Sequence, residues 1–296
     1  MRAAVALLLF LAGCAAAPPA APPRAPADSV VAVEEVAHFR QARALGAGPA
    51  GRLYVVDAAE SAIVVLDSVG GRRAFIGGPG TGPYALLEPA DVDPTNGLDL
   101  YVADAGNGRL QRFSDDGRLV ESLAVPLDPE APEERGTEEG LPGRPVSVAA
   151  GPARTLFAVE ANGRRVLRWD TGRAVRRATA PPPGTEGAPV DPVAVAVFSE
   201  GTLAVADRAQ AAVLLYDAYG SFLRAIPAQA VGEVRNVAVS GRRLLVVGPA
   251  AVAVHILDGG RLDLLAFDLG EPIVDAAVTL GHLHVLTPTR LLRVAR

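Results

Sequence analysis

A five-residue segment recurs six times along the chain and constrains the fold more than any other feature. The six copies end at Asp57, Asp104, Glu160, Asp207, Gly248 and Thr287. Each copy is mostly apolar, as in LYVVD at 53–57 and LYVAD at 100–104, and successive copies lie 47, 56, 47, 41 and 39 residues apart. Because one four-stranded propeller blade takes about 40–50 residues, the repeat predicts six such units.

Apolar residues and glycines divide each unit into strands. In the first five units, apolar residues stand six and nine positions after the end of the copy, and a glycine follows soon after. A further apolar stretch precedes each copy, as at 146–150. The 31 glycines and 25 prolines supply many turns and few places for long helices. We therefore predict an all-β chain, a six-bladed β-propeller of four-stranded blades.

The sixth unit is one strand short, because the chain ends soon after LLRV at 291–294. The segment SVVAVEE at 29–35 is strand-like and belongs to no unit. We expect this N-terminal strand to pair onto the last blade, since closing a ring removes exposed sheet edges. The predicted propeller domain covers residues 29–296.

The repeats resemble NHL repeats. The most similar stretches are IGGPGTG at 76–82 and LYVADAGNGRLQRF at 100–113, and the resemblance covers residues 39–294. Units five and six lose the acidic residue and the Asn/Arg turn. The resemblance implies a propeller that most often serves as a binding platform and, in a minority of related proteins, as an enzyme, so it does not decide the function.

The first 28 residues indicate export and attachment to a lipid. Arg2 precedes a short apolar stretch at 3–12, and LAGC at 11–14 resembles the lipobox of bacterial lipoproteins. The resemblance implies a signal peptide at 1–13 and lipidation, including palmitate, of Cys14, the single cysteine of the chain. Residues 14–28 are rich in Ala and Pro and are predicted to form a tether. Ala15, in place of Asp, favours the outer membrane in this resemblance.

The innermost strands bring equivalent residues of all six units to the propeller axis. Aligned twelve or thirteen residues before the end of each copy are Ala44, Asp91, Ser147, Ala194, Asn236 and Asp275, with Arg43 as the alternative to the first. Carboxylate and amide oxygens suit Ca²⁺ or Mg²⁺, and gluconolactonase-like propellers, which this arrangement resembles, use a comparable axial set. The candidate ligand site is Asp91, Asn236, Asp275, Ser147 and Arg43. We expect Arg43 to point inward and neutralise a carboxylate, which gives a watered mouth without a metal; a calcium site at Asp91, Asn236 and Asp275 is the alternative.

Other polar features have simpler interpretations. The acidic residues that end the first four copies are expected to hold turns by accepting backbone N–H groups. His282 and His284 alternate on one strand, and a lyase subgroup of NHL-like propellers uses axial histidines around zinc, but here only the last unit offers them. The acidic stretch 128–143 is interpreted as a solvated insertion or as a contact for a basic partner.

Composition excludes several classes of function. The chain has no lysine, which excludes Schiff-base chemistry and a Gly-Lys phosphate loop. A net charge of −5 argues against nucleic-acid binding. The sequence shows no evident catalytic set, so the main prediction is a monomeric, lipid-anchored envelope protein that is not an enzyme and binds a protein or small ligand without a cofactor. The alternatives are a divalent-metal hydrolase or lactonase with an axial site, and a glycan or peptidoglycan binder, for which 14 aromatic residues offer few stacking surfaces.

Overall fold

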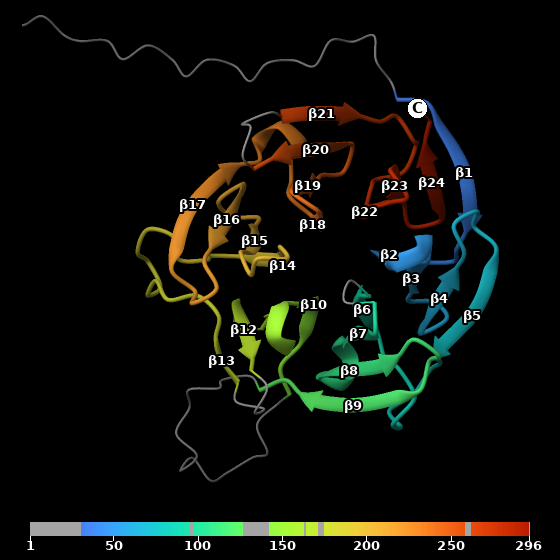
Figure 1. Cartoon of the computed structure of the whole chain (residues 1–296), viewed down its shortest axis with the longest axis horizontal. Coiled ribbons are helices and arrows are strands. Elements are labelled where there is room, and N and C mark those ends of the chain that lie inside the picture. The colour runs from blue at the N-terminus through green and yellow to red at the C-terminus, as the bar shows by residue number, and fades with distance from the viewer. Residues whose placement is uncertain are drawn as a thin grey trace, which may run out of the picture.

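The computed structural model describes residues 31–94, 97–126, 142–162, 164–170, 175–257 and 262–295. Six four-stranded antiparallel sheets surround a central axis, as the sequence predicted (Figure 1). The predicted signal peptide, Cys14, the tether at 14–28 and most of the acidic stretch 128–143 lie outside the described residues. None of the helices in the described part is long and apolar enough to span a membrane.

In the first five blades the strands follow one another in chain order from the axis outwards. Blade 1 contains β2 (Ala42–Ala47), β3 (Leu53–Asp57), β4 (Ala62–Leu66) and β5 (Arg72–Gly77). Blade 2 contains β6 (Pro89–Asp93), β7 (Asp99–Asp104), β8 (Arg109–Ser114) and β9 (Leu119–Ala124). Blade 3 contains β10 (Pro145–Ala150), β11 (Leu156–Glu160), β12 (Arg165–Trp169) and β13 (Val175–Arg177). Blade 4 contains β14 (Pro192–Val197), β15 (Leu203–Asp207), β16 (Ala212–Tyr216) and β17 (Phe222–Pro227). Blade 5 contains β18 (Asn236–Ser240), β19 (Arg243–Val247), β20 (Ala251–Ile256) and β21 (Leu262–Ala266). Four short 3-10 turns are η1 (Pro49–Gly51), η2 (Ala105–Asn107), η3 (Pro152–Arg154) and η4 (Gln229–Val231).

The sixth blade joins the two ends of the chain. It contains β22 (Asp275–Thr279), β23 (His282–Leu286) and β24 (Arg290–Val294), with β1 (Val33–His38) as its outer strand. β1 runs antiparallel to β24, with Val33 opposite Val294 and His38 opposite Arg290. Closure by the N-terminal strand is therefore confirmed. The strand runs from Val33 to His38 and so extends beyond the predicted segment 29–35, of which residues 29 and 30 lie outside the described residues.

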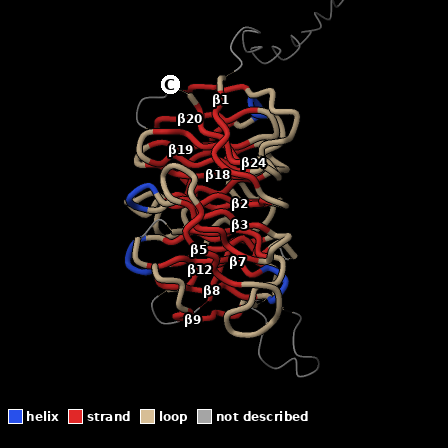
Figure 2. Tube along the Cα trace, turned by 90° about the vertical axis from the view of Figure 1, so that its right-hand side faces the viewer, coloured by secondary structure: helices blue, strands red, loops and turns tan. Residues whose placement is uncertain are grey.

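Loops and turns lie at the two opposite faces of the ring (Figure 2). Because neighbouring strands are antiparallel, the turns from first to second and from third to fourth strand lie together at one face, which we name the turn face. The turns from second to third strand and the connections between blades lie at the other, the connection face. The innermost strands begin at the connection face.

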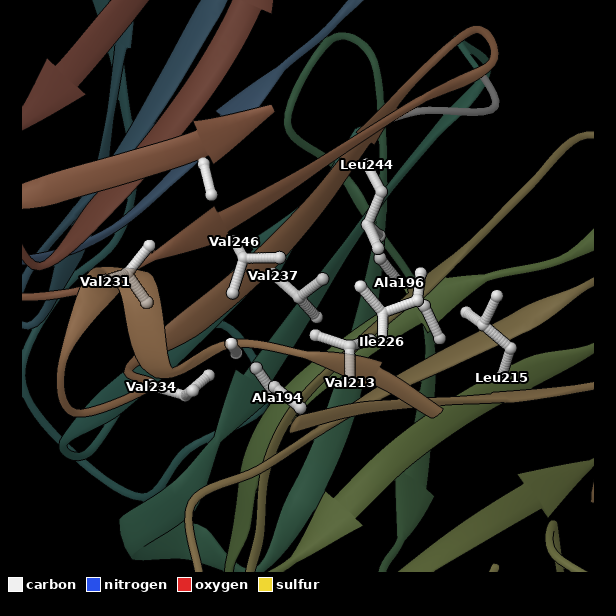
Figure 3. Close-up of a cluster of buried hydrophobic side chains, with 14 of the residues drawn as sticks. Ala194, Ala196, Val213, Leu215, Ile226, Val231, Val234, Val237, Leu244 and Val246 are labelled. Carbon is white, nitrogen blue, oxygen red and sulfur yellow. The ribbon is translucent and has the colours of Figure 1, made fainter. Parts of the chain in front are cut away.

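The core consists of apolar side chains that fill the spaces between neighbouring blades. In β3 all five residues are buried, because alternate side chains enter different clusters: Val56 packs toward blade 2, and Leu53 and Val55 pack toward blade 6. Figure 3 shows the cluster between blades 4 and 5, where Val213 and Ile226 pack near Val237 and Val246. The second strand of a blade is covered on both faces, so its sequence is a continuous apolar run and not an alternating one.

The acidic residues that end the repeats hold the connections between blades. Asp57 accepts the backbone N–H groups of Arg40 and Gln41 at 3.0 and 3.1 Å. Asp207 accepts those of Val190 and Asp191 at 2.6 and 3.0 Å. The turn-holding interpretation is thus confirmed. Unit five has Gly248 in this place, because a Cβ there would lie 1.9 Å from the carbonyl oxygen of Val231.

Candidate functional site

The strand register places six equivalent residues in one ring around the axis. Ala44, Asp91, Ser147, Ala194, Asn236 and Asp275 each pair with the residue just before the end of a repeat copy. In blade 1 a β-bulge between Ala42 and Ala44 takes up Arg43. Ala44 thus occupies the ring position, and Arg43 is not among the residues that line the axial cavity.

Arg43 therefore does not take the inward position expected from the sequence. The bulge inserts one residue just before the ring position, and blades 2, 3 and 4 have the same bulge, with Ala90, Val146 and Val193 in the place of Arg43. Its charge contributes instead at Glu88, whose pKa is lowered first by Arg144 and further by Arg43. The carboxyl groups at the axis consequently lack the neutralising arginine that we expected.

A cavity of about 270 Å³ follows the axis from this ring toward the turn face. Its polar lining includes Asp91, Asn236 and Asp275, and much of the remaining lining is apolar, including Val92 and Val195. The structure therefore brings together three of the predicted site residues, one from each of blades 2, 5 and 6. Ser147 belongs to the same ring but lies behind the cavity wall, 2% exposed.

The polar ring residues link neighbouring blades through hydrogen bonds. One carboxylate oxygen of Asp91 accepts the Ser147 hydroxyl at 2.7 Å and the Val148 N–H at 2.8 Å. The Ser147 hydroxyl oxygen in turn accepts the Val195 N–H at 3.1 Å. The inner edge of an innermost strand has no partner strand, so its N–H groups need acceptors of this kind.

Asp275 closes the same chain of contacts between the last blade and the first. Its carboxylate accepts the Leu45 N–H and the Ala276 N–H, both at 2.7 Å. The side chain of Asn236 also donates to it, and this bond lowers the pKa of Asp275. These ring side chains have a structural role whatever chemistry they perform.

Burial shifts both axial carboxyl groups toward the protonated form. It raises the pKa of Asp91 to about 7, against the lowering effect of the Ser147, Val148 and Val92 donors. It raises the pKa of Asp275 well above the ordinary value, and the charge of Asp91 raises it further. Two coupled carboxyl groups with raised pKa values retain protons near neutral pH, so the pair can accept and donate protons there.

The described residues do not supply a complete metal site. In the described ranges no group of three or more His, Cys, Asp or Glu side chains could hold a metal ion. Asp91, Asp275 and Asn236 offer two carboxyl groups and one amide, and their oxygens already accept backbone N–H groups. Calcium takes six to eight oxygen ligands, from backbone carbonyls and water as well as side chains, so these three side chains alone would not fill its coordination sphere.

The two histidines of the last blade lie elsewhere. His284 is 2% exposed, pairs across the sheet with Arg293 and Ala277, and is absent from the lining of the axial cavity. Burial and the nearby Arg293 lower its pKa to about 4. The axial histidine arrangement that the lyase resemblance implies is not formed.

Asp93 is a cavity residue that the sequence analysis did not select. It lines the cavity two residues beyond Asp91, and its carboxylate accepts the Ala150 N–H at 2.5 Å. Side chains two residues apart on a strand point to the same side. The sequence DVD at 91–93 therefore carried a signal for both residues.

Comparisons with known proteins match the fold at low sequence identity. No protein-family model matches the sequence, and no curated protein matches it. A solved putative gluconolactonase has a TM-score of 0.66 at 14% identity, over 91% of this chain and 92% of that chain. A gluconolactonase from Xanthomonas campestris has a TM-score of 0.64 at 12% identity, over 88% and 87% of the two chains. A streptogramin B lyase has a TM-score of 0.63 at 9% identity, over 89% and 97%.

These comparisons correct the main functional prediction. A non-catalytic binding platform was expected, whereas the similar propellers are named as gluconolactonases and a lyase, which are enzymes. At 9–14% identity the similarity shows the six-bladed fold. The prediction that the chain is not an enzyme is therefore not retained.

Proposed function

We propose that the chain is an enzyme of the lactonase type, a hydrolase that opens a small cyclic ester in the axial cavity. The observation that carries the proposal is the Asp91 carboxyl group, whose pKa of about 7 lies near neutral pH and which lines a cavity beside Asp275. A carboxyl group is an effective general acid or base when its pKa lies near the working pH. Since one water takes about 30 Å³ in the liquid, a 270 Å³ cavity suits a small substrate.

The two carboxyl groups have different roles in this proposal. Ionised Asp91 accepts a proton from a water molecule while the oxygen of that water forms a bond to the carbonyl carbon of the substrate. Protonated Asp275 donates its proton to the ring oxygen as the bond from that oxygen to the carbonyl carbon breaks. The product is an open-chain hydroxy acid. The donors from Ser147 and Val148 hold Asp91 in one orientation, which is the requirement for proton transfer at a fixed atom.

The test is an assay of the hydrolysis of glucono-1,5-lactone and other small lactones, in which the rate is measured from the release of protons. We expect hydrolysis above the buffer rate, a rise in rate as the pH passes about 7, and a loss of about 10²–10⁴-fold in Asp91→Asn. Asp116→Asn, an exposed carboxyl group on the turn after β8, is the matched control. Parallel assays with calcium and with a chelator report any metal requirement. Equal rates for Asp91→Asn and the control would refute the role of Asp91, and no hydrolysis of any lactone would refute the substrate class.

We also propose that the chain is a monomeric lipoprotein of the cell envelope, with signal peptide 1–13, lipid on Cys14 and tether 14–28, at the outer membrane where there is one. The support is the LAGC sequence and the single cysteine. Cys14→Ser is expected to leave the precursor uncleaved and unlabelled by fatty acid. A lipidated Cys14→Ser protein would contradict this proposal.

We further assign the repeats to the NHL type. The supporting feature is the GNGR turn at 106–109, where Asn107 and Arg109 donate to Asp104 at 2.8 and 2.7 Å.

A further inference from the structure

The N-terminal strand enters the ring at the turn face. β1 begins at Val33, opposite Val294 at the end of β24, and it runs from there toward the connection face. The proposed lipid anchor precedes β1 in the sequence, so the anchor joins the ring at the turn face. The inference below rests on that proposed anchor. Residues 14–30 can span at most about 60 Å when fully extended, so the anchor keeps the ring close to its membrane.

The turn face of blades 6, 1 and 2 exposes large apolar side chains. Leu280 lies between β22 and β23 and is 63% exposed, Val69 lies between β4 and β5 and is 75% exposed, and Leu98 lies between β6 and β7 and is 76% exposed. All three turns lie at the end of the strands where β1 begins. Exposed apolar groups gathered in one region mark a contact surface more often than isolated ones do.

These turns contact one another and form one surface. A Cβ on Gly51 would lie 2.6 Å from a methyl carbon of Leu280 and 3.0 Å from Ser68, the neighbour of Val69. A Cβ on Gly97 would lie 2.7 Å from Pro49. We name the continuous surface the apolar crescent; its residues are Leu280, Val69, Ala50, Pro49 and Leu98.

Two hollows border the apolar crescent and share Ala50 and Arg52 in their lining. The larger, of about 510 Å³, is lined in part by Phe75 and Ile76. Charges of both signs surround the crescent, with Arg52 near Asp115 and Asp116. The surface therefore favours a partner bound through apolar contact over one selected by net charge.

Leu280 stands in a conformation that folding alone does not favour. Its φ is +49°, and Gly281 follows with φ +78°, so the turn needs two residues in the left-handed region. Asn-Gly is the usual choice for such a turn, and a leucine there is strained. An exposed, strained leucine stabilises neither the turn nor the core, which points to a role outside folding.

We propose that the turn face lies on the surface of a lipid bilayer, with the apolar crescent inserted at the boundary between headgroups and acyl chains. The anchor supplies a high local concentration of lipid at this face, so a few apolar side chains suffice for contact. In this orientation the connection face points to the aqueous side, and the axial cavity, which runs from Asp91 and Asp275 toward Ser240 and Gly241, reaches the turn face.

The experiment replaces the natural anchor, so that it does not depend on lipidation of Cys14. Residues 28–296 contain every strand of the ring, and an N-terminal hexahistidine tag attaches them to phosphatidylcholine vesicles that contain a chelator lipid. This segment has no native cysteine, so Val69→Cys carries a single environment-sensitive fluorophore. Tyr84→Cys, 63% exposed in the connection between β5 and β6 on the opposite face, carries the control fluorophore.

Attachment to vesicles is expected to shift the emission of the fluorophore at residue 69 to the blue and to leave that at residue 84 unchanged. Adding Leu280→Asn is expected to reduce the shift at residue 69 while the melting temperature stays equal or rises, since Asn suits the turn. Equal shifts at both positions, or no effect of Leu280→Asn, would overturn the proposal. A blue shift that grows with protein concentration without vesicles would indicate a second copy as the occupant and would also overturn it.

Discussion

Asp91→Asn tests the electrostatics of the axial cavity through the pH dependence of stability. The folded protein raises the pKa of Asp91 to about 7, so it binds a proton more tightly than the unfolded chain does. A raised pKa contributes stability that is fully present below the unfolded value and is lost as the pH rises through about 7. Wild-type protein should therefore lose stability between pH 5 and pH 8, and a neutral asparagine should remove this part of the loss.

The size of the effect follows from the pKa. Each pKa unit corresponds to about 1.36 kcal/mol, so the two units between pH 5 and pH 7 give an upper limit of roughly 3 kcal/mol. Asp91 is partly open to the cavity, and water there reduces the penalty, so we expect about 1 to 2 kcal/mol. The lost hydrogen bonds of the carboxylate affect both pH values alike, and they cancel in the comparison.

Urea unfolding followed by the fluorescence of Trp169, the single and buried tryptophan, measures the free energy of unfolding at pH 5 and pH 8. The control is Asp116→Asn, because the Ser114 hydroxyl lowers the pKa of Asp116 and keeps it ionised at both pH values. The difference between wild type and Asp91→Asn should change by 1 to 2 kcal/mol in favour of the variant at pH 8, an estimate that follows from about 1.36 kcal/mol per unit. If this difference changes with pH no more than it does for the control, Asp91 titrates as an ordinary carboxyl group, and Asp91 and Asp275 do not form a coupled pair with raised pKa values.

Two further predictions concern the ring itself. Deleting residues 15–27 should leave the melting temperature of the domain nearly unchanged, whereas deleting residues 15–38 removes β1 from β24 and should lower it by many degrees in a thermal melt; equal melting would refute closure by this strand. Arg109→Ala should destabilise the domain by about 3 to 5 kcal/mol in urea unfolding, because it removes the cation at 2.7 Å from the fully buried Asp104 carboxylate and leaves that charge with hydrogen bonds from Leu87, Asn107 and Gln111. The exposed Arg118→Ala should change the free energy of unfolding by less than about 1 kcal/mol, and similar losses for both variants would contradict this ranking.

The fold could be predicted from the sequence because it consists of one repeated structural unit. Apolar runs such as 53–57 and 100–104 report strands covered on both faces, and their spacing reports the blade. The ring of Asp91, Asn236 and Asp275 could also be aligned, since each stands at a fixed distance from a repeat. These features depend only on local register.

The chemistry of the site depends on contacts between blades, which no local pattern records. In unit one the alignment left Arg43 and Ala44 as alternatives, and the bulge, which blades 2, 3 and 4 share, gives the ring position to Ala44. The pKa of Asp275 is raised first by burial between the blades and then by the charge of Asp91, a residue four blades earlier in the chain. The sequence therefore located the carboxyl groups but not their protonation, and on that basis the site was interpreted as a neutralised, non-catalytic mouth.

The pairing of β1 with β24 also imposes an order on biosynthesis. Val33 and Glu34 are among the first residues of the ring to leave the ribosome, yet their partners Val294 and Arg293 are among the last. Until then both the first strand and the open blade carry unpaired backbone edges, which are prone to wrong association. Loop closure over more than 250 residues is entropically demanding. The nascent chain is thus kept from completing its native structure until synthesis has ended, and whatever binds it in that interval acts on an open ring.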